Sequence, residues 1–315
     1  MKEKAKAKRN RTLVLENGDI EKYSAKLISL KGNRSLKSVT DKIINQDIFE
    51  VLKYLPENFV DLLFIDPPYN LQKSFNTINF KKRSIEEYSE WVDQLISGIK
   101  KILKPDASIY FCSEWNSSTS VHLVLNKYFK VKNRITWERE KGRGSKSNWK
   151  NNSEDIWFCT NGDDYKFNAD AVKLKRKVIA PYRTNDGKPK DWGDEGYRLT
   201  YPSNIWTDLT VPFWSMPENT EHPTQKPEKL LAKLILANSN EGDFIFDPFL
   251  GSGTTAVVAK KLGRRFAGVE IDEKFACIAQ KRLSRTKQND KIQGIDDGVF
   301  WERNSIYSVT KGSKN

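Results

Sequence analysis

The chain has 315 residues, of which 54 are Lys or Arg and 41 are Asp or Glu, and its formal net charge is +13. This length is ample for one large domain, or for one domain with a sizeable insertion. The positive charge favours a polyanionic partner, either nucleic acid or an anionic membrane surface. No run of about 18 apolar residues occurs, which excludes a membrane-spanning helix.

The basic N-terminal stretch MKEKAKAKRNR has no apolar segment behind it, so we expect no secretory signal. A solvated, disordered tail is the more usual structure for such a stretch than a dedicated binding arm. Cys112, Cys159 and Cys277 are scattered and two lie in apolar runs, which is typical of core thiols in a reducing compartment and predicts a cytoplasmic protein. With 2 histidines and no CxxC or HxxxH pair, we expect no metal site.

Apolar runs alternate with helical patterns along the first half of the chain. Residues 60–66 predict a buried strand, and residues 84–105 predict an amphipathic helix that Pro105 ends. Three further strands are expected at 107–113, 131–139 and 154–162.

The alternation returns after residues 173–221, where basic residues, Pro, Gly and Trp mix without a clear period. Helices are expected at 227–239, 253–263 and 273–284, and strands at 243–247 and 265–272. This βαβα order predicts an α/β fold with a mainly parallel sheet and helices on both faces. The polar residues beyond Arg285 predict no element.

A glycine loop, DPFLGSGTT, follows the strand expected at 243–247. Gly251 and Gly253 remove side chains where a ligand approaches the backbone between a strand and a helix. The loop is not a phosphate P-loop, because no GK[ST] follows, and it lacks the G-x-G-x-x-G spacing of dinucleotide sites. Taken alone, such a turn is often only structural.

Glu270 ends the next strand, where an acid is the usual partner of ribose hydroxyls. A glycine loop, a ribose-binding acid and the lack of a phosphate-binding lysine together favour an adenosine without phosphates. S-adenosylmethionine fits that description.

The stretch LLFIDPPYNL ends a hydrophobic run in an acid, two prolines and an aromatic ring. Asp66 follows the strand at the edge where such sheets bind ligands. Pro67 and Pro68 fix φ and remove two N–H donors, so a carboxylate and a rigid backbone carbonyl present two acceptors to an exocyclic amino group. Tyr69 offers a flat face on which a flipped-out base stacks. The alternative is a Pro-Pro turn that merely ends the strand.

These residues resemble those of the S-adenosylmethionine-dependent DNA amino-methyltransferases. The catalytic motif of that family, [DNS]-PP-[YFW], is DPPY at 66–69, and its F-x-G-x-G loop is FLGSG at 249–253. HPTQKP at 222–227 lies just upstream of the loop, where β enzymes carry the same hexad. DPPY precedes FxGxG, which resembles the β arrangement, and the resemblance runs from about residue 40 to residue 283.

The resemblance implies a Rossmann-like class I methyltransferase fold with an inserted target-recognition region. The expected segments are a basic N-terminal extension (1–39), a catalytic half with DPPY (40–172), the target-recognition region (173–221), a cofactor-binding half with FxGxG (222–285) and a polar C-terminal tail (286–315).

The resemblance also implies roles for individual residues. Asp66, Pro67, Pro68 and Tyr69 would be catalytic. The cofactor would contact Asp47, Asp66, Thr224, Lys226, Phe249, Gly251, Ser252, Gly253, Thr254, Glu270 and Asp272, with Asp47 at the adenine and Glu270 at the ribose. Thr224 and Lys226 are expected at the methionine carboxylate, with DNA phosphate as the alternative for Lys226. His222 is either a capped turn residue or a catalytic one.

Asp in the first position of the motif favours adenine N6 over cytosine N4 by a tendency of the family. The leading interpretation is therefore site-specific methylation of adenine in duplex DNA, in a restriction–modification system or as a solitary enzyme. The alternatives are cytosine N4 methylation, an RNA substrate and a non-catalytic DNA-binding module of the same fold. By the resemblance we also expect a homodimer.

Two segments, 139–150 and 173–190, carry most of the local positive charge, and neutralising phosphates with them would make the affinity fall steeply with salt. Contacts with double-stranded DNA are expected from Arg139, Lys141, Arg143, Lys146, Arg176, Arg183 and Arg198. For each of these, a solvated surface charge is the alternative.

Overall fold

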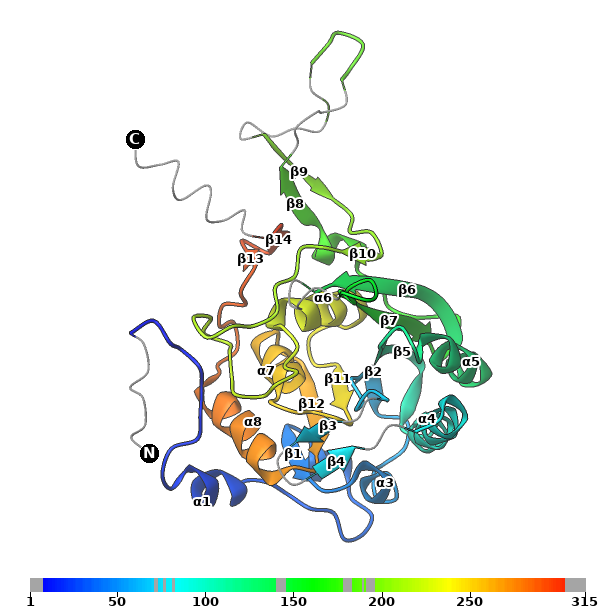
Figure 1. Cartoon of the computed structure of the whole chain (residues 1–315), viewed down its shortest axis with the longest axis vertical. Helices are drawn as coiled ribbons and strands as arrows, with labels where there is room; N and C mark the ends of the chain where they lie inside the picture. The colour runs from blue at the N-terminus through cyan, green and yellow to red at the C-terminus, as the bar shows by residue number, and fades with distance from the viewer. Residues whose placement is uncertain are drawn as a thin grey trace.

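The computed structural model describes residues 8–70, 73–75, 78–80, 83–139, 146–177, 183–188, 190 and 196–303, with the backbone alone at 73–75 and 78–80. A central sheet is covered by helices on both faces (Figure 1), which confirms the predicted α/β fold. None of the helices in the described part of the chain combines the length and the apolar character that spanning a membrane requires.

The central sheet has eight strands in the order β1-β12-β11-β2-β5-β7-β6-β10. Their bounds are β1 (Lys42–Asn45), β12 (Arg265–Glu270), β11 (Phe244–Asp247), β2 (Val60–Ile65), β5 (Leu103–Ser113), β7 (Ser153–Thr160), β6 (Lys130–Glu138) and β10 (Ile205–Trp206). Neighbours from β1 to β5 are parallel. Strand β7 runs antiparallel to both β5 and β6, and β10 is parallel to β6.

The strand directions bring acidic residues to one edge of the sheet. Asn45 pairs with Glu270, and Asp247 pairs with Gly268, so β1, β11 and β12 end close together. Because β7 is antiparallel, its beginning lies at that same edge: Asp155 pairs with Ser113, the last residue of β5. This edge therefore collects the ends of the parallel strands and the start of β7.

Helices lie on both faces of the sheet (Figure 1). One face carries α3 (Ile48–Val51), α4 (Ile85–Lys100) and α5 (Ser118–Tyr128), and the other carries α6 (Glu228–Asn238), α7 (Thr254–Lys261) and α8 (Glu273–Arg285). Two short helices, α1 (Asp19–Ser24) and α2 (Leu36–Val39), precede the sheet.

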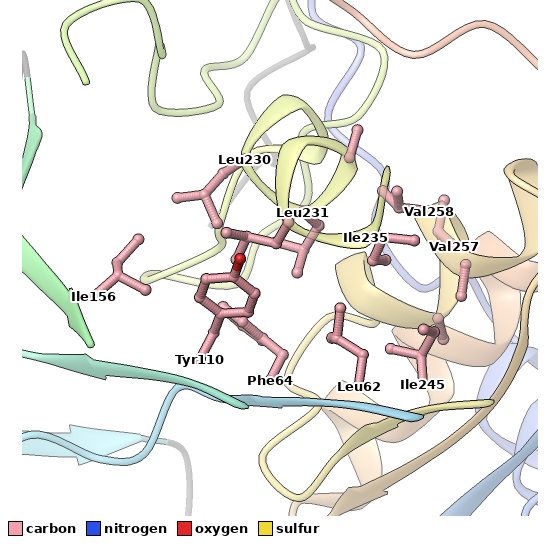
Figure 2. Close-up of a cluster of buried hydrophobic side chains, with 14 of the residues drawn as sticks. Leu62, Phe64, Tyr110, Ile156, Leu230, Leu231, Ile235, Ile245, Val257 and Val258 are labelled. Carbon is pink, nitrogen blue, oxygen red and sulfur yellow. The ribbon is translucent and has the colours of Figure 1, made fainter. Parts of the chain in front are cut away.

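Strand β2 is buried on both faces, which explains why its residues are apolar except for Asp61. Asp61 is buried and paired with Lys104 and Lys166. Leu62 and Phe64 point towards α6 and α7, where Leu231 and Val257 belong to the same cluster (Figure 2). Alternate residues, among them Leu63, pack on the other face with α3, α4 and α5. Burial on both sides fixes the position at which β2 ends and thus the position of the loop that follows.

The predicted helix at 84–105 is shorter than expected. It begins after Ser84, whose side chain and that of Glu87 form a reciprocal capping box, and it ends at Lys100 rather than at Pro105. Pro105 instead lies within β5. The pairing of β5 with β2 shifts register between Val60 and Leu62, and this irregularity accommodates a residue that cannot donate to the ladder.

A smaller four-stranded sheet, with the order β13-β14-β8-β9, projects from the central domain (Figure 1). It consists of β8 (Leu174–Lys177), β9 (Tyr197–Thr200), β13 (Ile295–Asp296) and β14 (Val299–Trp301), and η1 (Ala169–Val172) leads into it. A separate hairpin is formed by β3 (Lys73–Phe75) and β4 (Ile78–Phe80). Part of the expected C-terminal tail therefore pairs with the expected target-recognition region.

The N-terminal stretch is tied to the rest of the protein. The Arg11 N–H donates to the Trp214 carbonyl at 2.7 Å, and the Leu13 N–H donates to the Asn219 carbonyl at 2.8 Å. The expectation of a disordered tail is therefore wrong for Arg11, because backbone pairing rather than side-chain burial holds it. Residues 1–7 lie outside the described part of the chain.

Candidate active site

A cavity of about 460 Å³ opens at the carboxyl edge of the central sheet. Asp66, Pro67, Pro68 and Tyr69 line one part of its wall. The wall also contains all of the predicted cofactor residues except Gly253. The structure thus brings the two motifs together in one cavity, although they are far apart in the sequence.

The Asp66 carboxylate is held by a lysine from the hexad at 222–227. The Lys226 Nζ lies 2.7 Å from each carboxylate oxygen of Asp66, and the Lys226 side chain is 7% exposed. Lys226 therefore reaches the acid of the DPPY motif, and its predicted contact with the cofactor carboxylate stays a prediction.

A second carboxylate, Glu154 at the start of β7, joins this pair. The Tyr69 Oη lies 3.0 Å from Asp66 Oδ1 and 3.0 Å from Glu154 Oε2. Lys226 Nζ is 3.2 Å from the same Glu154 oxygen, and Arg139 Nη1 is 2.5 Å from the other. The result is a partly buried cluster of two carboxylates and two cations around the tyrosine hydroxyl.

Burial and charge shift the protonation equilibria of this cluster. Burial raises the pKa of the Asp66 carboxyl, and the Lys226 ammonium opposes that rise. Burial would also raise the pKa of Glu154, but Lys226 and Arg139 together lower it below its ordinary value. Burial alone would lower the pKa of Lys226, yet the two carboxylates hold it above its ordinary value. Lys226 is therefore a cation in this site.

The loop that carries the DPPY motif is held at Pro68 and Asn70. Asn70 is buried, its amide donates to the Arg83 carbonyl at 2.9 Å, and the Arg83 N–H donates to the Asn70 Oδ1 at 2.7 Å. The Tyr88 hydroxyl on α4 lies 3.5 Å from the Pro68 carbonyl. These contacts and the fixed φ of two prolines keep the motif in one conformation.

Glu270 lies on the cavity wall at the end of β12, two strands away from β2 in the sheet. Its carboxylate accepts hydrogen bonds from the Gly251 and Asp272 N–H groups, both at 2.8 Å. Burial raises the pKa of Glu270 to about 7. Asp272 caps α8 by accepting from the Phe275 N–H at 3.0 Å, and Asp47 caps α3 by accepting from the Phe49 N–H at 2.8 Å.

The comparisons with known proteins agree with this geometry. The sequence profile of the DNA methylases matches residues 60–281. The chain belongs to the DNA methylase family.

Several known methylases are similar to the chain. The DNA adenine methyltransferase YhdJ of Escherichia coli (strain K12) is 34% identical over 248 residues, covering 76% of this chain and 82% of that protein. The Type II methyltransferase M.BglII of Bacillus subtilis is 32% identical over 299 residues, covering 88% and 81%. The solved M1.HpyAVI–SAM complex has a TM-score of 0.50 and 23% identity, covering 76% of this chain and 98% of that one. Family membership confirms the resemblance to S-adenosylmethionine-dependent DNA amino-methyltransferases, and the solved structure confirms the fold.

The two glycines of the loop in this methylase differ in role. Gly251 lines the cavity, and a Cβ there would lie 3.0 Å from His222 Nε2. Gly253 instead caps α7 with φ at +83°, and a Cβ there would lie 2.6 Å from the Cβ of Ala279. Close packing of α7 on α8 therefore explains Gly253, and the predicted cofactor contact of Gly253 has no support in the cavity wall.

His222 packs against the glycine loop of the methylase. Its ring lies 4.3 Å from that of Phe275 in an edge-on arrangement, and its Nδ1 accepts from the Thr224 N–H at 3.4 Å. Burial lowers the pKa of His222 to about 4, with the Lys226 and Arg282 cations acting in the same direction. A neutral turn residue that shapes the loop fits this position better than an acid or base.

The predicted DNA-binding residues of the methylase do not form one group. Arg139 lines the cavity and binds Glu154, whereas Lys146 and Arg183 are exposed. Arg176 Nε lies 2.8 Å from Glu302 Oε1. Arg176 on β8 is paired in the strand register with Arg198 on β9. Lys141 and Arg143 lie outside the described residues.

Glu154, Asp247 and Trp91 also line the cavity, and none of the three was predicted as a site residue from the sequence. Asp247 accepts from the Thr255 hydroxyl at 2.5 Å and the Phe249 N–H at 2.9 Å, and burial raises its pKa to about 7. Trp91 lies 5.9 Å from Phe249, ring to ring. The acid at the end of β11 is the signal that would have found Asp247, because the acids predicted to be functional also lie at the ends of the neighbouring strands β2 and β12.

In the described ranges, no three His, Cys, Asp or Glu side chains meet in a way that would hold a metal ion.

Proposed function

We propose that this methylase transfers a methyl group from S-adenosylmethionine to the N6 amino group of adenine in duplex DNA at a short specific sequence. The observation that carries the proposal is the shared cavity, whose wall holds Asp66 and Tyr69 on one side and Glu270 with the glycine loop on the other. A methyl donor and an amino group bound on these two sides would meet within the cavity.

The cavity residues fit S-adenosylmethionine. Glu270 is a half-buried carboxylate on the cavity wall, placed to accept hydrogen bonds from ribose hydroxyls. The rings of Trp91, Phe249 and Phe49 form an apolar wall beside Asp47, where a flat adenine ring fits. When bound there, S-adenosylmethionine supplies an electrophilic methyl group.

Residues of the DPPY motif would position the amino group for that transfer. The Asp66 carboxylate and the Pro67 carbonyl accept the two hydrogens of the amino nitrogen, which directs its lone pair towards the methyl donor. The Tyr69 ring stacks on the flipped-out base. Asp66 need not be a strong base, because the amine becomes far more acidic once it is methylated, and Asp66 then accepts the proton.

Adenine is the proposed target because of Asp66 and of the relatives. An aspartate before the two prolines favours adenine within this family, and the similar YhdJ is named a DNA adenine methyltransferase. The similarity to M.BglII, a Type II methyltransferase, supports a role in a restriction–modification system.

Two further features belong to the same proposal. We propose a homodimer by resemblance to β enzymes, and size-exclusion chromatography at several concentrations tests it, since a monomer at every concentration would contradict it. A cytoplasmic location agrees with double-stranded DNA as the partner and with Cys112, Cys159 and Cys277, which are buried free thiols.

The function can be tested in cells. Wild-type protein and Asp66→Ala are expressed in a bacterial host that lacks its own DNA methyltransferases, and modified bases are mapped by sequencing the genomic DNA. The proposal predicts N6-methyladenine within one short motif for the wild type and none for Asp66→Ala. N4-methylcytosine, or an unmodified genome with well-folded wild-type protein, would contradict it.

A further inference from the structure

Glu154 is a buried carboxylate that none of the sequence motifs includes. Its side chain is 3% exposed, and both of its oxygens are engaged. Arg139 Nη1 lies 2.5 Å from Oε1, while Tyr69 Oη and Lys226 Nζ lie 3.0 Å and 3.2 Å from Oε2. The second oxygen of Glu154 therefore shares the donors that also contact Asp66.

Lys226 occupies the acceptors that the substrate needs. Its Nζ lies 2.7 Å from both carboxylate oxygens of Asp66, which are the atoms that would accept a hydrogen of the target amino group. When that amino group binds, the ammonium has to weaken its contact with Asp66. A buried cation without a carboxylate is strongly unfavourable, so a second acceptor is required.

We infer that Glu154 is a positioning residue, which takes over the Lys226 ammonium when the target amino group binds Asp66. The inference rests on the proposed function. The displacement is small, because Nζ is already within 3.2 Å of Glu154 Oε2. Lys226 stays protonated throughout and no covalent bond changes. Arg139 balances the remaining charge of Glu154, so the cluster holds two cations and two carboxylates before and after the move.

This arrangement makes a specific prediction about pH. The titratable groups that face Asp66 are Lys226 before α6, Glu154 on β7, Tyr69 on its own loop, Tyr88 on α4, Cys112 on β5 and Asp247 at the end of β11. Glu154 raises the pKa of Asp66 and Lys226 lowers it. Removing either charge should therefore move the acid limb of the rate profile, and the two removals should move it in opposite directions.

The experiment measures single-turnover methyl transfer from methyl-labelled S-adenosylmethionine to unmodified genomic DNA between about pH 5 and pH 9. In Glu154→Gln the ammonium stays on Asp66, so the plateau rate should fall roughly tenfold or more, and the acid limb should move to lower pH. In Lys226→Met the acid limb should move to higher pH. A role in stability alone would not move the two limbs in opposite directions.

Two further variants complete the test. Glu138→Gln removes a carboxylate on the neighbouring strand β6, which contacts Arg303 at 3.9 Å and does not line the cavity. This variant should keep the plateau rate and the acid limb of the wild type. Glu154→Asp keeps the charge but shortens the reach, so its limb should match the wild type while its plateau rate falls.

Several results would overturn the inference. The first is a plateau rate and an acid limb in Glu154→Gln that match the wild type. The second is acid limbs that move in the same direction in Glu154→Gln and Lys226→Met. The third is a wild-type plateau rate in Glu154→Asp, and this variant decides the test if Glu154→Gln does not fold. Wild-type protein that transfers no label to DNA overturns the proposed function and this inference together. An active wild type with an unshifted Glu154→Gln overturns the inference alone.

Discussion

The ammonium of Lys226 lies 2.7 Å from both carboxylate oxygens of Asp66, although 160 residues separate the two in the sequence. This contact joins the loop after β2 to the hexad before α6. It places a buried cation against the acid that the proposed mechanism uses as a hydrogen-bond acceptor. The two motifs therefore form one charged cluster.

Tyr69 has two separable parts in this cluster. Tyr69→Phe removes the hydroxyl, which lies 3.0 Å from both Asp66 and Glu154, but keeps the ring. We expect the single-turnover rate to fall about tenfold, because one hydrogen bond to a charged group is lost. Tyr69→Ala should lose a further ~1–3 kcal/mol of base stacking. Equal losses in the two variants would show that the ring does not stack on the base.

Binding of S-adenosylmethionine should depend on pH through Glu270. Burial raises the pKa of Glu270 to about 7, so the carboxyl is largely protonated below that pH and accepts ribose hydroxyls poorly. The affinity should therefore rise as pH increases through 7, by up to about tenfold per unit below the pKa. Isothermal titration calorimetry from about pH 5.5 to pH 8.5 measures the dissociation constant.

Glu270→Gln is the control for that measurement. A glutamine cannot ionise, so the affinity should be lower above pH 7 and much less dependent on pH. Asp247, which also lines the cavity and whose pKa burial also raises to about 7, is expected to contribute a smaller dependence that persists in this variant. A variant with the full wild-type pH dependence would contradict a role for Glu270 in binding the ribose.

Gly253 and Gly242 form a matched pair for testing the packing of α7. Both have φ at +83°, but a Cβ at Gly253 would lie 2.6 Å from the Ala279 Cβ. In the described part of the chain, no heavy atom beyond the two adjacent residues would lie within 4 Å of a Cβ at Gly242. Gly242→Ala should cost about 1 kcal/mol of unfolding free energy from backbone strain alone. Gly253→Ala should cost about 1–3 kcal/mol more from overpacking. Urea denaturation measures both values, and equal losses would contradict this account of Gly253.

The salt dependence of DNA binding should distinguish exposed from paired cations. Lys146 is exposed, so Lys146→Gln should reduce the slope of log affinity against log salt by about 1 if it contacts a phosphate. Arg176→Gln should have a smaller effect, because Glu302 already lies 2.8 Å from its guanidinium. Fluorescence anisotropy at several salt concentrations measures the slopes. A larger change in Arg176→Gln than in Lys146→Gln would reverse this ranking.

The sequence predicted the residues that follow the parallel strands. Asp66 after β2, the glycine loop after β11 and Glu270 at the end of β12 all lie on the cavity wall. Their common edge follows from strand direction, because parallel strands in one sheet end at the same side. Local pattern was therefore sufficient for these three features, although not for Asp247 at the end of β11.

The sequence did not predict Glu154, because β7 is antiparallel to its neighbours. An antiparallel strand brings its first residues to the ligand edge, whereas the acids predicted from the sequence follow the ends of strands. The contact with Lys226 joins distant segments and leaves no local pattern. The pairing of β14 with β8 also joins distant segments and was not predicted. Strand β14 has three residues and lies in a polar region, so its sequence shows no strand pattern.

The most direct test of the function uses the purified protein. It is incubated with methyl-labelled S-adenosylmethionine and unmodified genomic DNA, and the DNA is then digested to nucleosides, with Asp66→Ala treated in parallel. The account predicts label in N6-methyladenine for the wild type, and none for Asp66→Ala, which should still bind the cofactor. Label in N4-methylcytosine, transfer only to RNA, or undiminished transfer by Asp66→Ala would contradict it.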